Sequence, residues 1–201
     1  MKFYRIAWVI VRAYLKIFNR WKVEGAENVP ETGAAVIIAN HISYADPVIV
    51  ACSVKRPVHF MAKEELFRIW GLKGLIKVLG AFPVKRGKID RTTLRTAAKH
   101  LDEGKLLGIF PEGTRYKSGK LGEFLPGASL FALRAGVPII PVAMKGTQRI
   151  IFNTITVRIG KPLVYPEYYG GKIGEEILTQ VTKDCHEQVQ MLLSETEENI
   201  A

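Results

Sequence analysis

A chain of 201 residues with 48% apolar and 24% charged side chains suits one domain with a buried core, and this composition excludes wholesale disorder. Lys and Arg number 29 against 19 Asp and Glu. Only 2 of these basic and 7 of these acidic residues lie beyond residue 171, so residues 1–171 carry a net charge of +15. Such a body is attracted to polyanions, whether nucleic acid, an anionic membrane surface or a phosphate-bearing substrate. Its basic residues are scattered and no recognition motif occurs, so we expect no nucleic-acid partner.

Residues 1–21 have apolar side chains at helical spacing, interrupted by basic residues. The longest unbroken apolar run, Ile6 to Val11, has six residues. A membrane span needs about 20 apolar residues and a signal-peptide core about 7–15, so we expect neither. A basic amphipathic helix of this kind is typical of the membrane interface, and a helix that simply packs on the domain is the alternative.

A second stretch that mixes bulky apolar residues with cations runs from 66 to 77. Apolar insertion and attraction to anionic lipid act together in such segments, so we expect both stretches to dock on an anionic membrane surface. The side chains expected to contact the membrane are Trp8, Ile10, Tyr14, Ile17 and Trp70. The protein is then expected to be peripheral or monotopic, at the cytoplasmic face of the cell membrane.

Residues 22–201 alternate between short apolar runs and helical patterns, and we predict that they form the second unit of the chain. Strands are predicted at 34–39, 57–61, 81–85, 106–110, 139–144 and 154–159. Helices are predicted from 46 onward and at 63–79, 90–104, 127–135 and 174–194, followed by an acidic tail that frays. Apolar strands without polar alternation are typical of parallel sheets. The sequence therefore predicts an α/β fold, a single domain with a mostly parallel central sheet flanked by helices.

The two cysteines, Cys52 and Cys185, lie far apart in apolar surroundings. Neither has a Cys or His neighbour at the spacing of metal ligands, so we expect no structural zinc. Free cysteines are among the most buried residue types, and we predict two free core thiols of a reducing compartment.

Chemistry in such a fold is expected in the loops at the carboxyl ends of strands. The loop after the strand at 34–39 contains His41 and Asp46. A spacing of five does not align two side chains on a helix, so the loop must curl back for them to meet. A carboxylate that holds one imidazole nitrogen as donor leaves the other free to accept a proton, which predicts a catalytic pair. The alternative is ordinary, because Asp before Pro is a common helix N-cap and a lone loop His often has no role.

The loop after the strand at 106–110 has the make-up of a phosphate site. Gly113 permits a tight turn, Thr114 and backbone amides can donate, and Arg115 offers a bidentate fork. A third basic stretch at 84–88 could aim further cations at the same crevice. Either segment could equally be a charged turn in solvent.

These segments together resemble the glycerolipid acyltransferase superfamily, closest to its bacterial 1-acylglycerol-3-phosphate O-acyltransferases. That family is marked by Asn-His, four residues and Asp; by a block from Gly to Arg; by Phe-Pro-Glu-Gly-Thr-Arg; and by Val-Pro-Ile-Ile-Pro-Val. This chain has the blocks in that order at 40–46, 80–86, 110–115 and 137–142. The second block matches only at its Gly and Arg ends, whereas the third and fourth match to the residue.

The resemblance implies transfer of a fatty acyl group from acyl-acyl carrier protein or acyl-CoA to the free hydroxyl of 1-acylglycerol-3-phosphate (lysophosphatidic acid), which gives phosphatidic acid for phospholipid synthesis. It implies His41 as the general base on that hydroxyl and Asp46 as the group that orients the imidazole. The residues implied to hold the phosphate of the acceptor are Glu112, Gly113, Thr114, Arg115, Arg86 and Lys85. No metal or other cofactor is implied, and no Gly-x-Ser-x-Gly elbow is present to supply a covalent acyl-enzyme.

Other functions remain open on the sequence. The acceptor could be glycerol-3-phosphate or another lysophospholipid. A basic protein that binds membranes or nucleic acid without catalysis would explain the charge, but it would not explain the paired His and Asp. The enzyme is therefore favoured.

Overall fold

The computed structural model describes residues 2–68, 74, 76, 80–84, 91–116 and 118–198. In these residues the central sheet has seven strands. The strands are β1 Arg20–Glu24, β2 Ala35–Ala39, β3 Val58–Lys63, β4 Phe82–Val84, β5 Leu106–Ile109, β6 Ile139–Lys145 and β7 Thr154–Ile159. Their order across the sheet is β1-β7-β6-β2-β5-β3-β4. Every neighbouring pair is parallel except β6 and β7, so the prediction of a mostly parallel sheet is confirmed.

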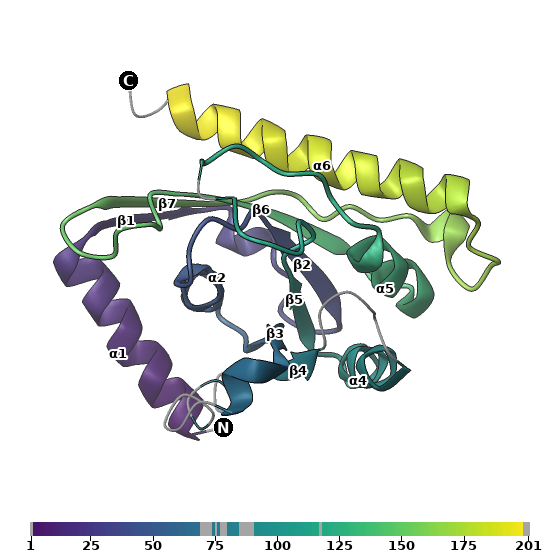
Figure 1. Cartoon of the computed structure of the whole chain (residues 1–201), viewed down its shortest axis with the longest axis horizontal. Helices are drawn as coiled ribbons and strands as arrows, with labels where there is room; N and C mark the ends of the chain where they lie inside the picture. Colours follow the sequence, from purple (N-terminus) through teal and green to yellow (C-terminus); the bar gives the residue numbers. More distant parts are fainter. Residues whose placement is uncertain are drawn as a thin grey trace.

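Helices cover both faces of this sheet (Figure 1). They are α1 Lys2–Phe18, α2 Asp46–Ser53, α4 Arg91–Asp102, α5 Gly127–Ala135 and α6 Glu175–Glu198, with 3₁₀ turns at Ala26–Asn28, Glu64–Arg68 and Pro166–Tyr168. Buried residues of α1 and α2 belong to one core, and those of α4, α5 and α6 to the other. None of the helices in the described ranges combines the length and the hydropathy that a bilayer span requires.

The middle strand β2 shows why its sequence is apolar without interruption. All five of its residues are buried. Side chains of a strand alternate between the two faces, so Ala35, Ile37 and Ala39 pack with α1 and α2. Val36 and Ile38 pack with α4, α5 and α6 on the opposite face. Burial on both faces is what a continuous apolar strand of a parallel sheet requires.

Strand β1 departs from the sequence prediction, which placed residues 1–21 in one helix. The helix ends at Phe18, and Arg20–Glu24 pairs with β7 as a parallel strand at the edge of the sheet. Trp21 therefore lies in a strand and not on the helix. The charged residues of β1 point outward in alternation with half-buried Trp21 and Val23, which is typical of an edge strand.

The carboxyl-terminal helix also departs from its prediction, because it continues through the acidic tail that was expected to fray. Helix α6 runs to Glu198. Leu192 and Thr196 are buried, and Glu195 forms an ion pair with Arg158 of β7 at 3.0 Å. Burial and this ion pair to the sheet hold the last turns in place.

The helix predicted at 63–79 is described only in part. It begins as a 3₁₀ turn at Glu64–Arg68, and most of the rest lies outside the described residues.

Cys52 and Cys185 are free and buried, as predicted. Burial raises the pKa of the Cys52 thiol to about 11 and that of the Cys185 thiol to about 12, so both are protonated at neutral pH.

Candidate active site

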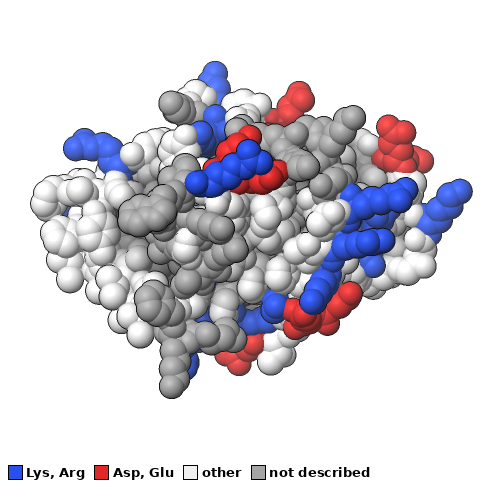
Figure 2. Space-filling view, turned by 60° about the horizontal axis from the view of Figure 1, so that its bottom comes forward, with Lys and Arg blue, Asp and Glu red and all other residues white. Residues whose placement is uncertain are grey.

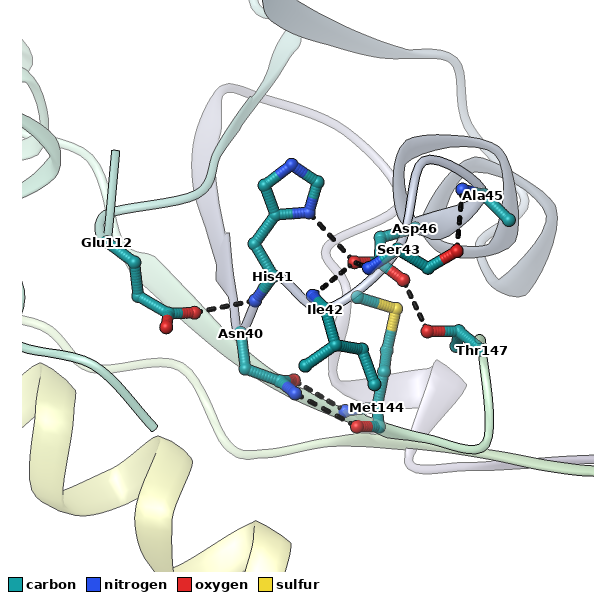
Figure 3. A network of polar contacts seen from close by, with 9 residues as sticks. All are labelled: Asn40, His41, Ile42, Ser43, Ala45, Asp46, Glu112, Met144 and Thr147. Carbon is teal, nitrogen blue, oxygen red and sulfur yellow. Dashed lines mark hydrogen bonds and ion pairs between the residues drawn. The ribbon is translucent and has the colours of Figure 1, made fainter. Parts of the chain in front are cut away.

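The carboxyl ends of β2, β5 and β6 lie side by side at one edge of the sheet, because these three strands are parallel neighbours. Asn40 and His41 follow β2, Glu112 lies in the loop after β5, and Thr147 lies just beyond β6. Figure 3 shows their polar contacts: the side chains of His41, Asp46 and Thr147 are linked to one another, Glu112 contacts the backbone of His41, and Asn40 contacts the backbone of Met144.

His41 and Asp46 meet as the sequence predicted. The Nδ1 atom of His41 lies 2.8 Å from Oδ2 of Asp46. Asp46 is the first residue of α2 but makes no side-chain cap there, so the ordinary N-cap alternative is wrong. The loop curls back so that the backbone N–H groups of Ile42 and Ser43 donate to the same Oδ2, at 2.7 and 2.8 Å. The carboxylate is thus held by the loop that it closes.

The other oxygen of the Asp46 carboxylate is also occupied. The hydroxyl of Thr147 donates to Oδ1. Both side chains are fully buried, so each carboxylate oxygen faces donors and no solvent. An ionised carboxylate accepts from all these donors at once.

This arrangement sets the tautomer of His41. Because the carboxylate accepts, Nδ1 carries the proton and Nε2 has a free lone pair. Figure 3 shows the Nε2 side of the ring pointing away from the network. The ring stacks on Phe110, with 4.1 Å between centroids and 19° between planes, and 16% of the His41 side chain is exposed. The imidazole is fixed in orientation, and a substrate can reach its outer edge.

Asn40 fastens this loop to β6. Its side-chain amide donates to the carbonyl of Met144 at 2.9 Å and accepts from the N–H of Met144 at 2.7 Å. The amide group thereby substitutes for a strand residue, and the two-point contact fixes the position of the neighbouring His41.

Glu112 has a different place from the one expected. It is 6% exposed, its Oε1 accepts from the N–H of His41 at 2.6 Å, and its Oε2 accepts from the N–H of Gly122 at 2.9 Å. Burial raises the pKa of the Glu112 carboxyl, and the two N–H donors and nearby His41 oppose that rise. A buried carboxylate with both oxygens occupied cannot hold a phosphate. The expectation that Glu112 binds the acceptor is therefore wrong, and its observed contacts join the two loops.

The next residues of this loop turn outward. Gly113 has a φ of 66°, a left-handed conformation that glycine adopts without strain, and its N–H closes the turn onto Phe110 at 3.1 Å. Thr114 is exposed. The guanidinium carbon of Arg115 lies 3.4 Å from the ring centroid of Tyr44, which belongs to the loop of His41. The structure thus brings Arg115 beside the His41–Asp46 loop, whereas Lys85 and Arg86 lie outside the described residues.

The residues expected to contact a membrane divide into three groups. Ile10 and Ile17 are exposed on α1, by 62% and 74%. Trp8 faces the domain and donates to the carbonyls of Ala51 and Val54, so the expectation for this residue is wrong.

Tyr14 is likewise half-buried, packs against the core, and donates through its hydroxyl to the carbonyl of Ile150 at 3.1 Å. Tyr14 therefore joins α1 to the loop of Ile150, and its contact with a membrane stays a prediction. Trp70 lies outside the described residues. Within the described ranges, no group of three or more His, Cys, Asp and Glu is placed to hold a metal ion.

Sequence reasoning missed Thr147 and the contact made by Asn40. Thr147 belongs to no recognised motif, and its neighbours in the sequence do not point to catalysis or binding. The one available clue is its place just beyond β6, at the sheet edge that carries His41.

Comparisons with known proteins show which family the chain resembles. Residues 20–145 match the family model described as Acyltransferase. The chain is 31% identical over 194 residues to a 1-acyl-sn-glycerol-3-phosphate acyltransferase of Borreliella burgdorferi, covering 90% of this chain and 77% of that protein. It is 28% identical over 190 residues to the Bacillus subtilis protein of the same name, covering 90% and 89%.

A solved structure is also similar. The crystal structure of the 1-acyl-sn-glycerophosphate acyltransferase PlsC from Thermotoga maritima superposes with a TM-score of 0.74 at 26% identity, covering 96% of this chain and 82% of that one. The family model spans more than half of the chain and includes the loops of both His41 and Glu112. The chain belongs to the acyltransferase family.

Proposed function

We propose that this protein transfers a fatty acyl group from an acyl thioester to the free hydroxyl of 1-acylglycerol-3-phosphate, producing phosphatidic acid. The observation that carries the proposal is the His41–Asp46 pair, with Nε2 of His41 free at an accessible edge and Arg115 beside the same loop. The names of the relatives from Borreliella and Bacillus support the same acceptor.

In the proposed reaction, Nε2 of His41 accepts the proton of the acceptor hydroxyl while the hydroxyl oxygen attacks the thioester carbonyl. Asp46 stabilises the imidazolium that forms. The tetrahedral intermediate collapses to an ester, and the expelled thiolate takes the proton from His41. General-base assistance of this kind contributes about 10²–10⁴ in rate. The chain supplies every proton transfer through one residue, so no covalent acyl-enzyme is needed.

The phosphate of the acceptor is proposed to bind Arg115. Its guanidinium stacks on Tyr44, which aligns the fork while its N–H groups stay available to a bidentate anion. Thr114 and the backbone around Gly113 add donors, and Lys85 and Arg86 are proposed to add cations from the adjacent segment. The donor is acyl-acyl carrier protein or acyl-CoA, since both present the same thioester.

A membrane-surface location, peripheral and at the cytoplasmic face, is part of the proposal, and the lipid acceptor and α1 support contact with a membrane surface. One face of α1 packs on the core through buried Tyr4 and Leu15, and the opposite face exposes Ile6, Ile10 and Ile17. The helix is therefore both a packed element and an apolar surface, so the two alternatives from the sequence are compatible. Figure 2 shows mostly uncharged surface at its left end, the side on which α1 lies in Figure 1.

The experiment that tests this proposal is a thin-layer assay with a panel of acceptors and both donors. The expected result is a diacyl product from 1-acylglycerol-3-phosphate, loss of that product with His41→Ala, and little product from monoacylglycerol, which lacks the phosphate. Preferred acylation of glycerol-3-phosphate or of another lysophospholipid would replace the acceptor. No transfer to any acceptor, together with a salt-sensitive gel shift of nucleic acid, would replace the enzymatic function.

A further inference from the structure

The loop between β6 and β7 has an apolar tip on the surface. Ile150, Ile151 and Phe152 are 41%, 49% and 82% exposed. Phe152 has a φ of 51°, the one positive φ recorded for a residue other than glycine in the described part of the chain. Bulky residues rarely adopt this conformation, so the surrounding structure must impose it. A cluster of exposed apolar side chains held in this way is typical of an interaction surface.

Hydrogen bonds fix the tip to the end of α1. The N–H of Phe152 donates to the carbonyl of Phe18 at 2.7 Å, and the rings of these two residues meet edge to face. Buried Asn19 donates through its side chain to the carbonyl of Ile150 at 2.8 Å and accepts from the N–H of Asn153. The tip is thus a defined extension of α1, and its side chains are exposed because the backbone holds them there.

The base of the loop is closed by Asn153. Its side-chain amide donates to the carbonyls of Gly146 and Arg149, at 2.7 and 3.3 Å. Just after Gly146, Thr147 donates to the Asp46 carboxylate. One short loop therefore connects the His41–Asp46 pair to the exposed tip, and the position of the tip fixes the position of the pair relative to any surface on which the tip rests.

Cations and a hollow adjoin the tip. Lys16, Arg20 and Arg149 are exposed around it. A hollow of about 620 Å³ lies between the end of α1 and the loop. Its lining residues are Lys16, Ile17, Phe18, Asn19, Arg20, Phe152, Asn153 and Thr154. The lining has cations and polar groups but no carboxylate, so it complements a phosphate next to an apolar surface.

We propose that Ile150, Ile151 and Phe152 insert into the surface of an anionic phospholipid bilayer beside Ile17 of α1, and that a lipid phosphate occupies the hollow between Lys16 and Arg20. The proposal rests on the membrane-surface location proposed above, but not on the identity of the acceptor or the donor. It adds the loop between β6 and β7 as a further insertion element beside α1, and this loop is linked through Thr147 to Asp46.

The first experiment measures partition of the full-length protein onto vesicles of phosphatidylcholine with and without phosphatidylglycerol. Phe152→Gly is the main variant, because glycine adopts the left-handed backbone without strain and removes the ring. It should keep the thermal transition of the wild type and lose affinity about tenfold or more, the usual worth of burying a Phe ring. Met191→Asp, at a residue of α6 exposed by 46%, is the matched control and should bind as the wild type does.

The second experiment tests the phosphate in the hollow. Lys16→Gln together with Arg20→Gln should remove much of the preference for anionic vesicles, by about 5-fold for each cation lost. The F152W variant should gain fluorescence that brominated acyl chains quench, over the background of the wild-type tryptophans. Unquenched fluorescence, with the protein bound to the vesicles, would overturn insertion of the tip.

The remaining outcomes separate this proposal from the proposed function. Wild-type binding by Phe152→Gly, with binding abolished by Ile10→Asp and Ile17→Asp, would overturn the tip and leave α1 as the docking element. A lowered thermal transition with unchanged affinity would make Phe152 structural and also overturn it. Failure of the wild type to bind any vesicle, while it still acylates a short-chain water-soluble acceptor, would overturn the tip and the membrane location but not the reaction.

Discussion

The residue on which the proposed chemistry depends is His41, and its contacts separate its role from that of a structural histidine. Its ring is held by Asp46 and Phe110 while its Nε2 edge is accessible. We predict that His41→Ala lowers kcat/KM by about 10³ or more, because proton transfer and orientation are lost together.

Asp46→Asn keeps the size of the side chain but removes the charge that stabilises the imidazolium, so we expect it to be severe as well. Steady-state assays on variants with an unchanged thermal transition provide the check. If His41→Ala retains more than a tenth of the wild-type activity, His41 is not the base.

Thr147 is the clearest positioning residue of the site. Its hydroxyl holds Oδ1 of Asp46, so that Oδ2 faces His41. Thr147→Val keeps the shape but leaves a buried carboxylate oxygen without its donor, which costs about 1–3 kcal/mol. We predict a fall in kcat of about 5- to 150-fold with little change in the acceptor KM, and recovery of most activity by Thr147→Ser. Wild-type activity in Thr147→Val, together with a loss of activity in Thr147→Ser, would indicate that only the methyl group matters, and hence packing.

Arg115 separates binding from chemistry. We predict that Arg115→Ala raises the KM for 1-acylglycerol-3-phosphate and leaves the KM for the acyl donor nearly unchanged. Losing a charge-assisted bidentate contact costs about 1.5–3 kcal/mol, or about 10- to 150-fold. Arg115→Lys should rescue only part, because an ammonium cannot reproduce the fork or its stacking on Tyr44. An unchanged acceptor KM in both variants would move the phosphate contact to another cation, with Arg86 the next to test.

At the scale of elements, the site depends on loops that hold one another. Glu112 joins the loop after β2 to the loop after β5 through the N–H groups of His41 and Gly122. In the Glu112→Gln variant, the side-chain NH₂ replaces one carboxylate oxygen and faces one of these backbone N–H groups. One hydrogen bond between the loops is then lost, and two hydrogen-bond donors face each other. We predict a loss of about 1–3 kcal/mol in the free energy of unfolding and a lower kcat. Exposed Glu123→Gln is the matched control and should alter neither. A Glu112→Gln protein with wild-type stability would show that the loops are held by other contacts.

The elements also show where sequence patterns suffice. The strands β2, β5, β6 and β7 were predicted within one residue at each end, because they are largely buried and rich in aliphatic residues, which alternate with polar residues only in β7. Strand β1 was missed, because Arg20–Glu24 is a short edge strand with charged residues and continues the apolar spacing of the preceding helix. The orientation of α1 was only half predicted. Helical spacing identifies apolar faces, but only the partners of Trp8 and Tyr14 decide which face packs on the domain.

The site shows the same limit. His41 and Asp46 were predicted from their spacing and their family motif, and the structure brings them within 2.8 Å of each other. Glu112 belongs to another motif of the same family, yet sequence could not tell a carboxylate that binds substrate from one that accepts two buried amides. Thr147 lies 101 residues from Asp46 along the chain, so only the register between β2 and β6 brings them together.

At the scale of the whole molecule, a pair of histidines makes the stability of the fold depend on pH. His59 of β3 and His100 of α4 stack with their ring centroids 4.6 Å apart, and His59 Nδ1 donates to the carbonyl of Gly80 at 3.0 Å. Burial lowers the pKa of both imidazoles, and Lys105 lowers both further. His59 adds to the lowering for His100, whereas the Gly80 contact and Glu103 act in the opposite direction. The pair is therefore neutral in the folded protein over a range in which free histidine takes up a proton.

The consequence is a loss of stability in acid, with a sign that follows from linkage. In the unfolded chain both histidines titrate near a pKa of about 6.5. Below that pH the unfolded state binds more protons than the folded state, so the free energy of unfolding falls as pH drops from about 6.5 toward the lowered folded values. We predict this fall in denaturant titrations between pH 7.5 and 5. His100→Phe preserves the ring stack with His59 but removes one titrating group, so its stability should vary less with pH over the same range. Equal slopes for the wild type and this variant would show that the acid sensitivity arises elsewhere in the fold.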